Sequence, residues 1–285
     1  MKLEDYESTY DPNEIGGDIK LRISKSSFMQ ARQCLRKYWW NKVQFPDVWL
    51  PPTEAILRGN AVHESLEKVY TEYKGETVLR PLFPYDEYED TYDALAFLEQ
   101  QRLEAWGRGH FKPIEHEKKR KVYDPVNDVV MVGAWDGLLE HPNGEGLVLV
   151  ELKTGDLSSS KLSRVRRELC FYARMIELLG YKKPVTHMML ISSDCTNDRT
   201  AKMVLKQKNK EIFLGEEKGI TIIERLGKRS RDAFYRDYLR VIDDLKSMNW
   251  TPNWSEFFCA NYCDYHLSCD DELHGLGEDP TKGGA

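Results

Sequence analysis

The sequence predicts a mixed α/β protein built on one central sheet. Two runs rich in β-branched and apolar residues, 129–140 and 147–153, flank the turn sequence HPNGEG and predict a β-hairpin. Helical spacing of apolar residues follows over 161–179, and a further apolar run follows at 185–192. A helix between two strands favours a crossover connection, so we expect strand 185–192 to lie parallel to an earlier strand.

Further helices and strands are expected before and after this middle region. The amphipathic helical segments are 28–38, capped by Ser26 or Ser27, 56–70, capped by Thr53, 90–106 and 231–248. Short strands are expected at 212–214 and 220–224. Residues 1–19 and 273–285 are rich in polar residues and glycine, so we expect both ends to be disordered and 20–272 to form a single domain.

Composition and charge restrict the possible partners of the chain. Its 285 residues carry 41 Lys and Arg against 47 Asp and Glu, a net charge of -6. A histone-like coat of positive charge is therefore excluded, and any nucleic acid must be held by local basic patches. The acidic N-terminus resembles no secretory signal and no apolar run is long enough to span a membrane, which predicts a cytosolic protein without membrane contact.

Three charged residues of the expected hairpin point to a catalytic site. Asp136 interrupts an apolar strand, Glu151 and Lys153 share one face of the next strand, and the turn brings the two strands together. Carboxylates are preferred ligands of Mg²⁺ or Mn²⁺, and a nearby lysine suits phosphodiester hydrolysis. The alternative is structural: Asp136 begins a turn, and Glu151 and Lys153 form a solvated pair.

The segment GAWDGLLEHPNGEGLVLVELKTG resembles the core of the PD-(D/E)XK nucleases, and RGNAVHESLEKVY is similar to the RecB-like branch of that superfamily. The resemblance covers roughly residues 23–270. It implies a nuclease core with a mixed central sheet and flanking helices. It also implies that Lys153 assists the attacking water while four groups hold Mg²⁺ or Mn²⁺: His63, Asp136, Glu151 and the backbone carbonyl of Leu152.

The same resemblance extends to the helix after the hairpin. RecB-like nucleases usually show Gln-X-X-X-Tyr there, near the active site and the DNA, and this chain has Glu168 and Tyr172 at that spacing. Glu168 departs from the pattern, and Tyr172 is equally compatible with core packing. With Arg58 beside Gly59, these residues are the candidate substrate-binding groups.

Four cysteines form a second motif. Cys259, Cys263 and Cys269 follow a C-x3-C-x5-C pattern, and Cys34 is the expected fourth donor of a metal centre. The pattern resembles the iron–sulfur RecB-like nucleases, including AddB-type and CRISPR-associated relatives, and implies a [4Fe-4S] cluster that joins the N- and C-terminal segments. Zn²⁺ at the same four thiolates stays open as an alternative. Cys170 and Cys195 are expected to be buried fillers.

The resemblance as a whole implies a metal-dependent deoxyribonuclease, expected to act as an exonuclease on single-stranded DNA ends in recombination, repair or processing, with a helicase or recombination partner. The competing interpretation is a non-catalytic DNA-binding or assembly module on a nuclease scaffold. Basic runs at 118–121 and 164–167 either face a phosphate backbone or form solvated surfaces. The aromatic residues 38–40 either stack on bases or pack the N-terminal helix.

Overall fold

The computed structural model describes residues 21–44, 51–75, 78–195 and 210–274. Backbone contacts divide the chain into two units, one formed by residues 1–22 and 51–234 and the other by 23–50 and 235–285. The second unit therefore joins the beginning and the end of the chain. The expected disorder of 1–19 and 275–285 falls outside the described residues, and residues 273 and 274 of the expected disordered tail are instead the end of a helix.

A five-stranded mixed sheet is the centre of the first unit. Its order is β4 (Gly137–Glu140), β5 (Leu147–Lys153), β6 (Val185–Ser192), β8 (Ile220–Arg225) and β7 (Lys210–Leu214). Strands β5 and β6 are parallel, and the other neighbouring pairs are antiparallel. The expected mixed sheet and the parallel placement of strand 185–192 are confirmed.

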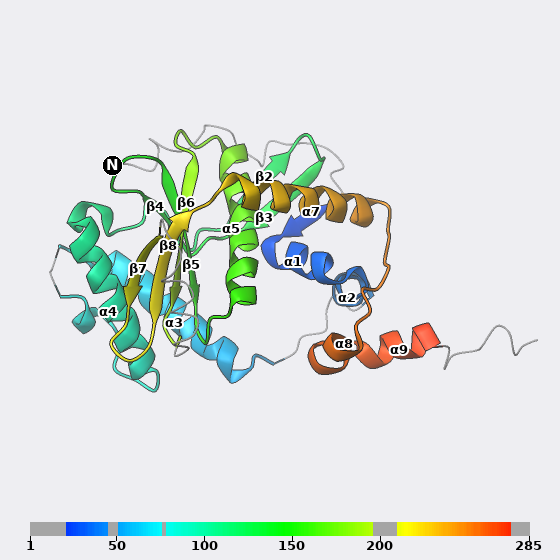
Figure 1. Ribbon diagram of the computed structural model, residues 1–285, viewed down its shortest axis with the longest axis horizontal. Helices are drawn as coiled ribbons and strands as arrows, with labels where there is room; N and C mark the ends of the chain where they lie inside the picture. Colours follow the sequence, from blue (N-terminus) through cyan, green and yellow to red (C-terminus); the bar gives the residue numbers. More distant parts are fainter. Residues whose placement is uncertain (1–20, 45–50, 76–77, 196–209, 275–285) are drawn as a thin grey trace, which may run out of the picture. The chain divides into compact units, whose positions relative to one another are not determined.

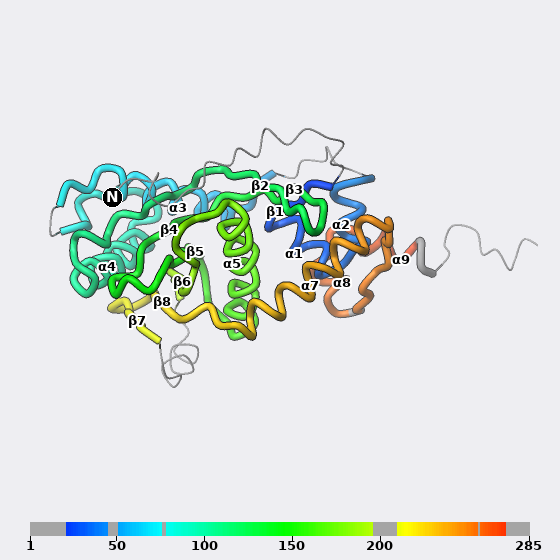
Figure 2. The backbone as a smooth tube through the Cα atoms, turned by 90° about the horizontal axis from the view of Figure 1, so that it is seen from above, coloured from blue at the N-terminus to red at the C-terminus, as the bar shows by residue number. Residues whose placement is uncertain are grey.

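Three long helices cover the sheet: α3 (Glu54–Glu72), α4 (Glu89–Trp106) and α5 (Ser159–Leu179). Helix α5 is the crossover between β5 and β6. It begins where the Ser158 side chain accepts a hydrogen bond from the Lys161 backbone and ends at Gly180, which has a φ of 75°. Figure 1 shows α5 along one side of the strands and α4 along the other, and Figure 2 shows the same arrangement from above.

The core lies between the sheet and helices α3 and α4. Val148, Val150 and Leu152 of β5 pack in one apolar cluster with residues of those two helices. Side chains alternate along a strand, so Glu151 and Lys153 point to the opposite face, which α5 covers. This alternation places the charged residues of β5 away from the apolar core and beneath α5.

The hairpin differs from the expected one in its first strand. The run 129–140 forms two strands in place of one: β3 (Val129–Gly133) pairs with β2 (Arg120–Asp124) outside the five-stranded sheet, and β4 pairs with β5. Asp136 lies in the break between β3 and β4. Its side chain accepts the Leu152 backbone N–H, so a carboxylate replaces a ladder carbonyl and the strand is interrupted there.

A buried ion pair holds α4 against its surroundings. Glu99 and Arg102 are both fully buried, with Arg102 Nη2 at 2.6 Å from Glu99 Oε2. The Tyr70 hydroxyl of α3 donates to the same carboxylate, and Arg102 also donates to the backbone carbonyls of His110 and Phe111. Each charge thus has close partners, which is the condition for burying an ion pair. Short helices η3 (Arg80–Leu82) and η4 (Arg108–His110) flank α4.

The second unit is helical. Its elements are α1 (Lys25–Gln33), α2 (Leu35–Trp39), the π-helical turn η2 (Trp40–Gln44), most of α7 (Lys228–Lys246), α8 (Glu256–Tyr262) and α9 (His266–His274), and the short strand β1 (Arg22–Ser24) precedes them. The expected first helix is interrupted at Cys34, which has an extended φ of -159°. Its cap is Ser24, not Ser26 or Ser27, because the Ser24 hydroxyl accepts the Ser27 backbone N–H.

The aromatic residues of α2 and η2 are used in packing within this unit. Tyr38 stacks on Trp250 at a ring distance of 6.3 Å, and Trp40 stacks on Tyr265 at 6.2 Å. These contacts favour packing over base stacking for the N-terminal aromatics. In the described part of the chain, every helix is too short or too polar to cross a membrane.

A stacked histidine pair makes the stability of the first unit depend on pH. The rings of His141 and His187 lie 4.2 Å apart, and burial, together with the charges of His141 and Arg225, lowers the pKa of His187 to about 4 against an opposing effect of Glu145. The unfolded chain takes up this proton near pH 6.5 while the folded chain resists it.

We therefore expect the free energy of unfolding to fall by about 1 to 2 kcal/mol as the pH is lowered from 7 to 4.5. Urea denaturation at several pH values measures this, and His187→Gln is the control that removes the titrating group. An equally steep pH dependence in His187→Gln would show that other groups are responsible.

Candidate active site

Asp136 and Glu151 lie side by side at the end of β5. Gly137 pairs with Val150, so one further step along the antiparallel register places Asp136 across from Glu151. Asp136 Oδ2 is held 2.6 Å from the Leu152 backbone nitrogen, and Glu151 is 1% exposed. The sequence therefore brings the two carboxylates together as expected, with the Leu152 backbone beside them.

His63 reaches this pair from α3. Its Nδ1 lies 3.9 Å from Asp136 Oδ1 and 2.8 Å from Oε1 of Glu117. Burial alone would lower the pKa of His63, but the hydrogen bond to Glu117 and the charges of Asp136, Glu117 and Glu151 together raise it above its ordinary value. The imidazole thus faces a strongly negative environment.

Glu117 is a site residue that the sequence motifs do not identify. It ends the stretch 114–117, which makes two backbone hydrogen bonds to Leu138 of β4 and one to Trp135 in the break before β4. One atom each from His63, Glu117 and Asp136 lie within 4.8 Å of one another, close enough to hold one metal ion. The segment EHEKK has no strand periodicity, so only the folded structure reveals this residue.

Lys153 lies between two carboxylates. Its Nζ is 2.5 Å from Glu151 Oε1 and 3.5 Å from Glu168 Oε2, and Glu168 Oε1 accepts a hydrogen bond from Arg164 at 2.9 Å. Glu168 is buried in α5. An acidic residue is stable at this position because two cations compensate its charge, and it holds the ammonium group of Lys153 in place.

Tyr172 packs beneath the same carboxylates. Its ring meets Trp135 edge to face at 6.1 Å, and a methyl group added at Gly133 would lie 2.6 Å from the ring. Burial first, and then the charges of Glu151 and Asp136, raise its pKa far above the ordinary value, so the hydroxyl keeps its proton. Tyr172 therefore both packs in the core and lies close to the carboxylates of the site.

Comparison with known families agrees with this geometry. The sequence profile of the PD-(D/E)XK nuclease superfamily matches residues 22–270. The chain belongs to the PD-(D/E)XK nuclease superfamily. No curated protein matches the chain significantly. Members of this superfamily are metal-dependent nucleases. The carboxylate donors found here fit Mg²⁺ or Mn²⁺, which both prefer oxygen ligands, and the imidazole of His63 lies beside them.

Arg58, the third candidate substrate-binding residue, forms an ion pair outside the carboxylate site. Arg58 Nη1 lies 3.3 Å from Asp194 Oδ2, and therefore pairs with the turn that follows β6. A side chain added at Gly59 would only touch Thr154 Oγ1 at 3.7 Å, so packing among the described residues does not demand a glycine there. The substrate-binding role of Arg58 stays a prediction.

Part of the basic surface is engaged in ion pairs. Arg120 donates to Glu115 at 2.7 Å, and Arg166 makes two hydrogen bonds to Glu224. Lys118, Lys119 and Lys121 are exposed. The run 118–121 therefore leaves three lysines at the surface, and the segment 164–167 is partly committed to internal contacts.

The four cysteines of the second motif all belong to the second unit. Cys34 caps α2, Trp40 Nε1 donates to the Cys269 sulfur at 3.2 Å, and the Asn253 N–H lies 3.5 Å from the Cys34 sulfur. Burial raises the pKa of Cys263 and of Cys269. All six cysteines are free thiols, and Cys170 and Cys195 are buried in the first unit.

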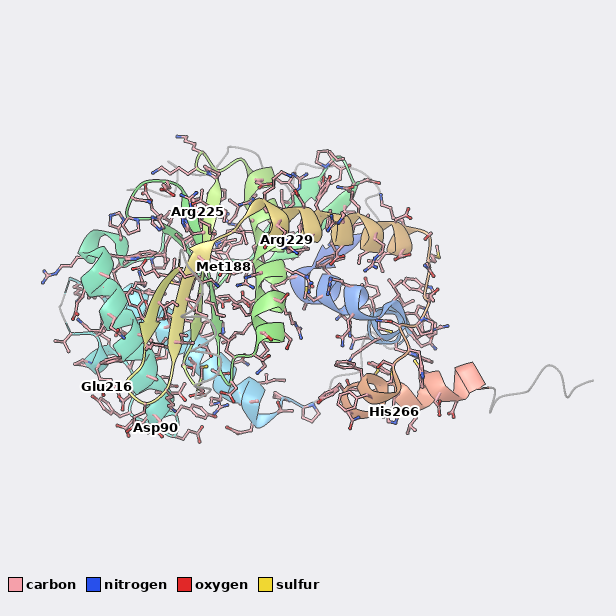
Figure 3. All side chains as sticks on the ribbon, viewed as in Figure 1. Asp90, Met188, Glu216, Arg225, Arg229 and His266 are labelled. Atoms are coloured by element: carbon pink, nitrogen blue, oxygen red, sulfur yellow. The ribbon has the colours of Figure 1, made fainter. Side chains whose placement is uncertain are left out.

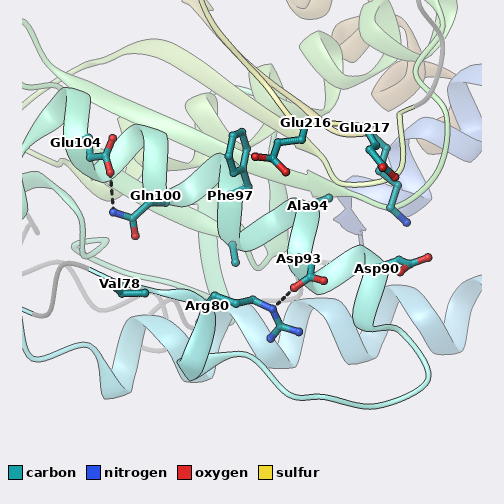
Figure 4. Close-up of a pocket in the computed structure, with 12 residues that line it drawn as sticks. Val78, Arg80, Asp90, Asp93, Ala94, Phe97, Gln100, Glu104, Glu216 and Glu217 are labelled. Atoms are coloured by element: carbon teal, nitrogen blue, oxygen red, sulfur yellow. Dashed lines mark hydrogen bonds and ion pairs between the residues drawn. The ribbon is translucent and has the colours of Figure 1, made fainter.

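A separate cavity of about 900 Å³ lies beside α4 (Figure 4). It shares no residue with the carboxylate site, and its charged lining consists of five acidic residues and two cations: Asp90, Asp93, Glu104, Glu216, Glu217, Arg80 and Lys218. Figure 3 marks Asp90 and Glu216 at this end of the unit. The excess of negative charge makes the cavity unsuited to a phosphate backbone.

The contact between Gly133 and Tyr172 gives a direct test of how the site is supported. We expect Gly133→Ala to lower the free energy of unfolding by about 1 to 3 kcal/mol, because its methyl group displaces the Tyr172 ring. Urea denaturation measures the effect. Gly109→Ala is the matched control, since its methyl group would meet no atom within 4 Å. Equal stability of the two variants would show that Tyr172 is not fixed by this contact.

Proposed function

We propose that the protein is a Mg²⁺- or Mn²⁺-dependent deoxyribonuclease. The observation that supports this most strongly is the convergence of His63, Asp136, Glu151 and Lys153, from α3, the β3–β4 break and β5, in a chain of the PD-(D/E)XK superfamily. His63, Asp136, Glu151 and the Leu152 carbonyl would hold the ion. The ion supplies positive charge at the scissile phosphate and makes water more acidic.

The other side chains of the proposed site act through charge and position. Lys153, held between Glu151 and Glu168, presents an ammonium group that stabilises negative charge developing on the phosphate and orients the attacking water. The Leu152 N–H donates to Asp136 and fixes its side chain. The entropy cost of ordering this carboxylate is therefore not added to the cost of binding substrate. Tyr172 supports these groups from below and keeps its proton.

Substitution of the central residues tests the hydrolytic role. We expect Asp136→Ala and Lys153→Ala each to reduce cleavage of DNA at least about 100-fold in Mn²⁺, because the first removes a proposed ligand of the ion and the second removes the ammonium group that acts on the reacting phosphate. Circular dichroism should show an intact fold. The assay uses end-labelled single- and double-stranded DNA, and Lys68→Ala, an exposed lysine of α3, is the matched control.

Full activity in either variant would contradict the assignment. Binding of DNA without cleavage by the wild-type protein would favour the non-catalytic DNA-binding or assembly module. We further propose, on the resemblance to RecB-like nucleases, an exonuclease that acts on single-stranded ends with a helicase or recombination partner. Linear and circular single-stranded DNA separate the modes, because an exonuclease leaves the circle uncut.

We also propose that Cys34, Cys259, Cys263 and Cys269 hold a structural [4Fe-4S] cluster, with Zn²⁺ as the alternative. The C-x3-C-x5-C pattern and its resemblance to the iron–sulfur RecB-like nucleases support the proposal, and all four cysteines belong to one unit. Four thiolate bonds would close a loop of more than two hundred residues and so restrain the unfolded chain.

Anaerobically purified protein is expected to be brown and to contain about four irons per chain. Cys34→Ala and Cys263→Ala should lose both colour and thermal stability, whereas Cys170→Ala, a buried cysteine of the other unit, should keep the colour. Colourless protein with one zinc would exclude the cluster but retain the four-cysteine centre. Full stability without any metal would exclude both.

A further inference from the structure

Glu117 faces the proposed site without belonging to any of its sequence motifs. Its Oε1 lies 2.8 Å from His63 Nδ1. Its side chain is 30% exposed, so it contacts solvent as well as the imidazole. Its backbone has a φ of 47°, a conformation that residues other than glycine adopt rarely. The Glu117 N–H donates to the Trp135 carbonyl, which fixes this conformation next to Asp136.

The choice of imidazole nitrogen distinguishes two roles for Glu117. A carboxylate that only orients a metal-binding histidine usually contacts the ring nitrogen that faces away from the metal. Here Glu117 and Asp136 both face Nδ1, at 2.8 and 3.9 Å. Glu117 therefore lies on the same side of the ring as the proposed ligand Asp136.

The spacing of the donor atoms agrees with a shared ion. The three atoms contributed by His63, Glu117 and Asp136 all lie within 4.8 Å of one another. Ligands on opposite sides of a Mg²⁺ ion, each at about 2.1 Å, are about 4.2 Å apart, and adjacent ligands are closer. The three side chains can thus surround one ion after small rotations.

We propose that Glu117 is a further ligand of the divalent cation, on the His63 side of Asp136. This inference rests on the proposed metal-dependent function. It adds one carboxylate to the ligand set of His63, Asp136, Glu151 and the Leu152 carbonyl. It also explains why an acidic side chain is held in a strained backbone conformation beside two other carboxylates.

Binding of Mn²⁺ to the full-length protein without DNA provides the test, by calorimetry or by electron paramagnetic resonance of free Mn²⁺. We expect Glu117→Gln to weaken binding at least tenfold. The glutamine keeps the side-chain oxygen near His63 but loses the charge. Glu67→Gln is the matched control, because Glu67 lies 3.6 Å from Nδ1 of another histidine, His116, outside the proposed ligand set.

Glu117→Ala separates a ligand from an orienting residue. A ligand role requires weaker Mn²⁺ binding in both Glu117→Gln and Glu117→Ala. An orienting role predicts wild-type affinity in Glu117→Gln, whose amide oxygen still accepts from the imidazole, and a loss only in Glu117→Ala. Wild-type affinity in Glu117→Gln would therefore overturn the proposal.

Thermal unfolding with and without Mn²⁺ gives a second readout. In EDTA, Glu117→Gln should be at least as stable as the wild type, since one of several neighbouring negative charges is gone. In Mn²⁺ its stabilisation should be smaller than that of the wild type. A lower stability in EDTA together with an unchanged Mn²⁺ shift would indicate a purely structural residue and overturn the proposal.

The variant Asp136→Asn distinguishes a failure of the Glu117 proposal from a failure of the proposed metal-dependent function. If Asp136→Asn loses Mn²⁺ affinity and Glu117→Gln does not, the proposed metal site stands and only the role of Glu117 is wrong. If Asp136→Asn binds Mn²⁺ as tightly as the wild type, the metal site proposed for the nuclease is itself wrong.

Discussion

Repulsion between carboxylates at the end of β5 is the constraint on which the arrangement of the first unit depends. Asp136 and Glu151 occupy neighbouring positions on antiparallel strands, where like charges are destabilising, and Glu117 lies beside them. The surrounding elements each supply a compensating group. Helix α3 contributes His63, and β5 contributes both the Leu152 N–H and Lys153. The carboxylates and the groups that compensate them thus come from segments that are distant in sequence as well as from β5 itself.

Strand alternation and close packing hold these groups in register. The even-numbered residues of β5 bury their side chains against α3 and α4, which fixes Glu151 and Lys153 on the face covered by α5. A slip of one residue would bury both charges in an apolar core. On the α5 side, the Tyr172 ring rests directly on Gly133, where a larger residue would not fit. The position of the carboxylates therefore depends on apolar contacts on both faces of the sheet.

Patterns local in sequence predicted most of the fold. Apolar periodicity identified the helices that became α3, α4 and α5, and the Asn143–Gly144 turn identified the β4–β5 pair, because these signals arise from neighbouring residues. The division of 129–140 into two strands was not predictable, since the interruption depends on a hydrogen bond between Asp136 and a distant backbone group. Glu117 was not predicted for the same reason: its position is set by a backbone hydrogen bond to Trp135 in the break between β3 and β4, not by its own segment.

The buried pair of Glu99 and Arg102 shows how this fold compensates a carboxylate that lies outside the proposed active site. Glu99 has a guanidinium group and a tyrosine hydroxyl as direct partners, and it is fully buried. At the end of β5 the carboxylates share their compensation: Lys153 contacts both Glu151 and Glu168, Arg164 also contacts Glu168, and the imidazole of His63 faces three carboxylates. Carboxylates that gather there despite their repulsion, with donor atoms of His63, Glu117 and Asp136 within 4.8 Å of one another, form a group that could hold a metal ion.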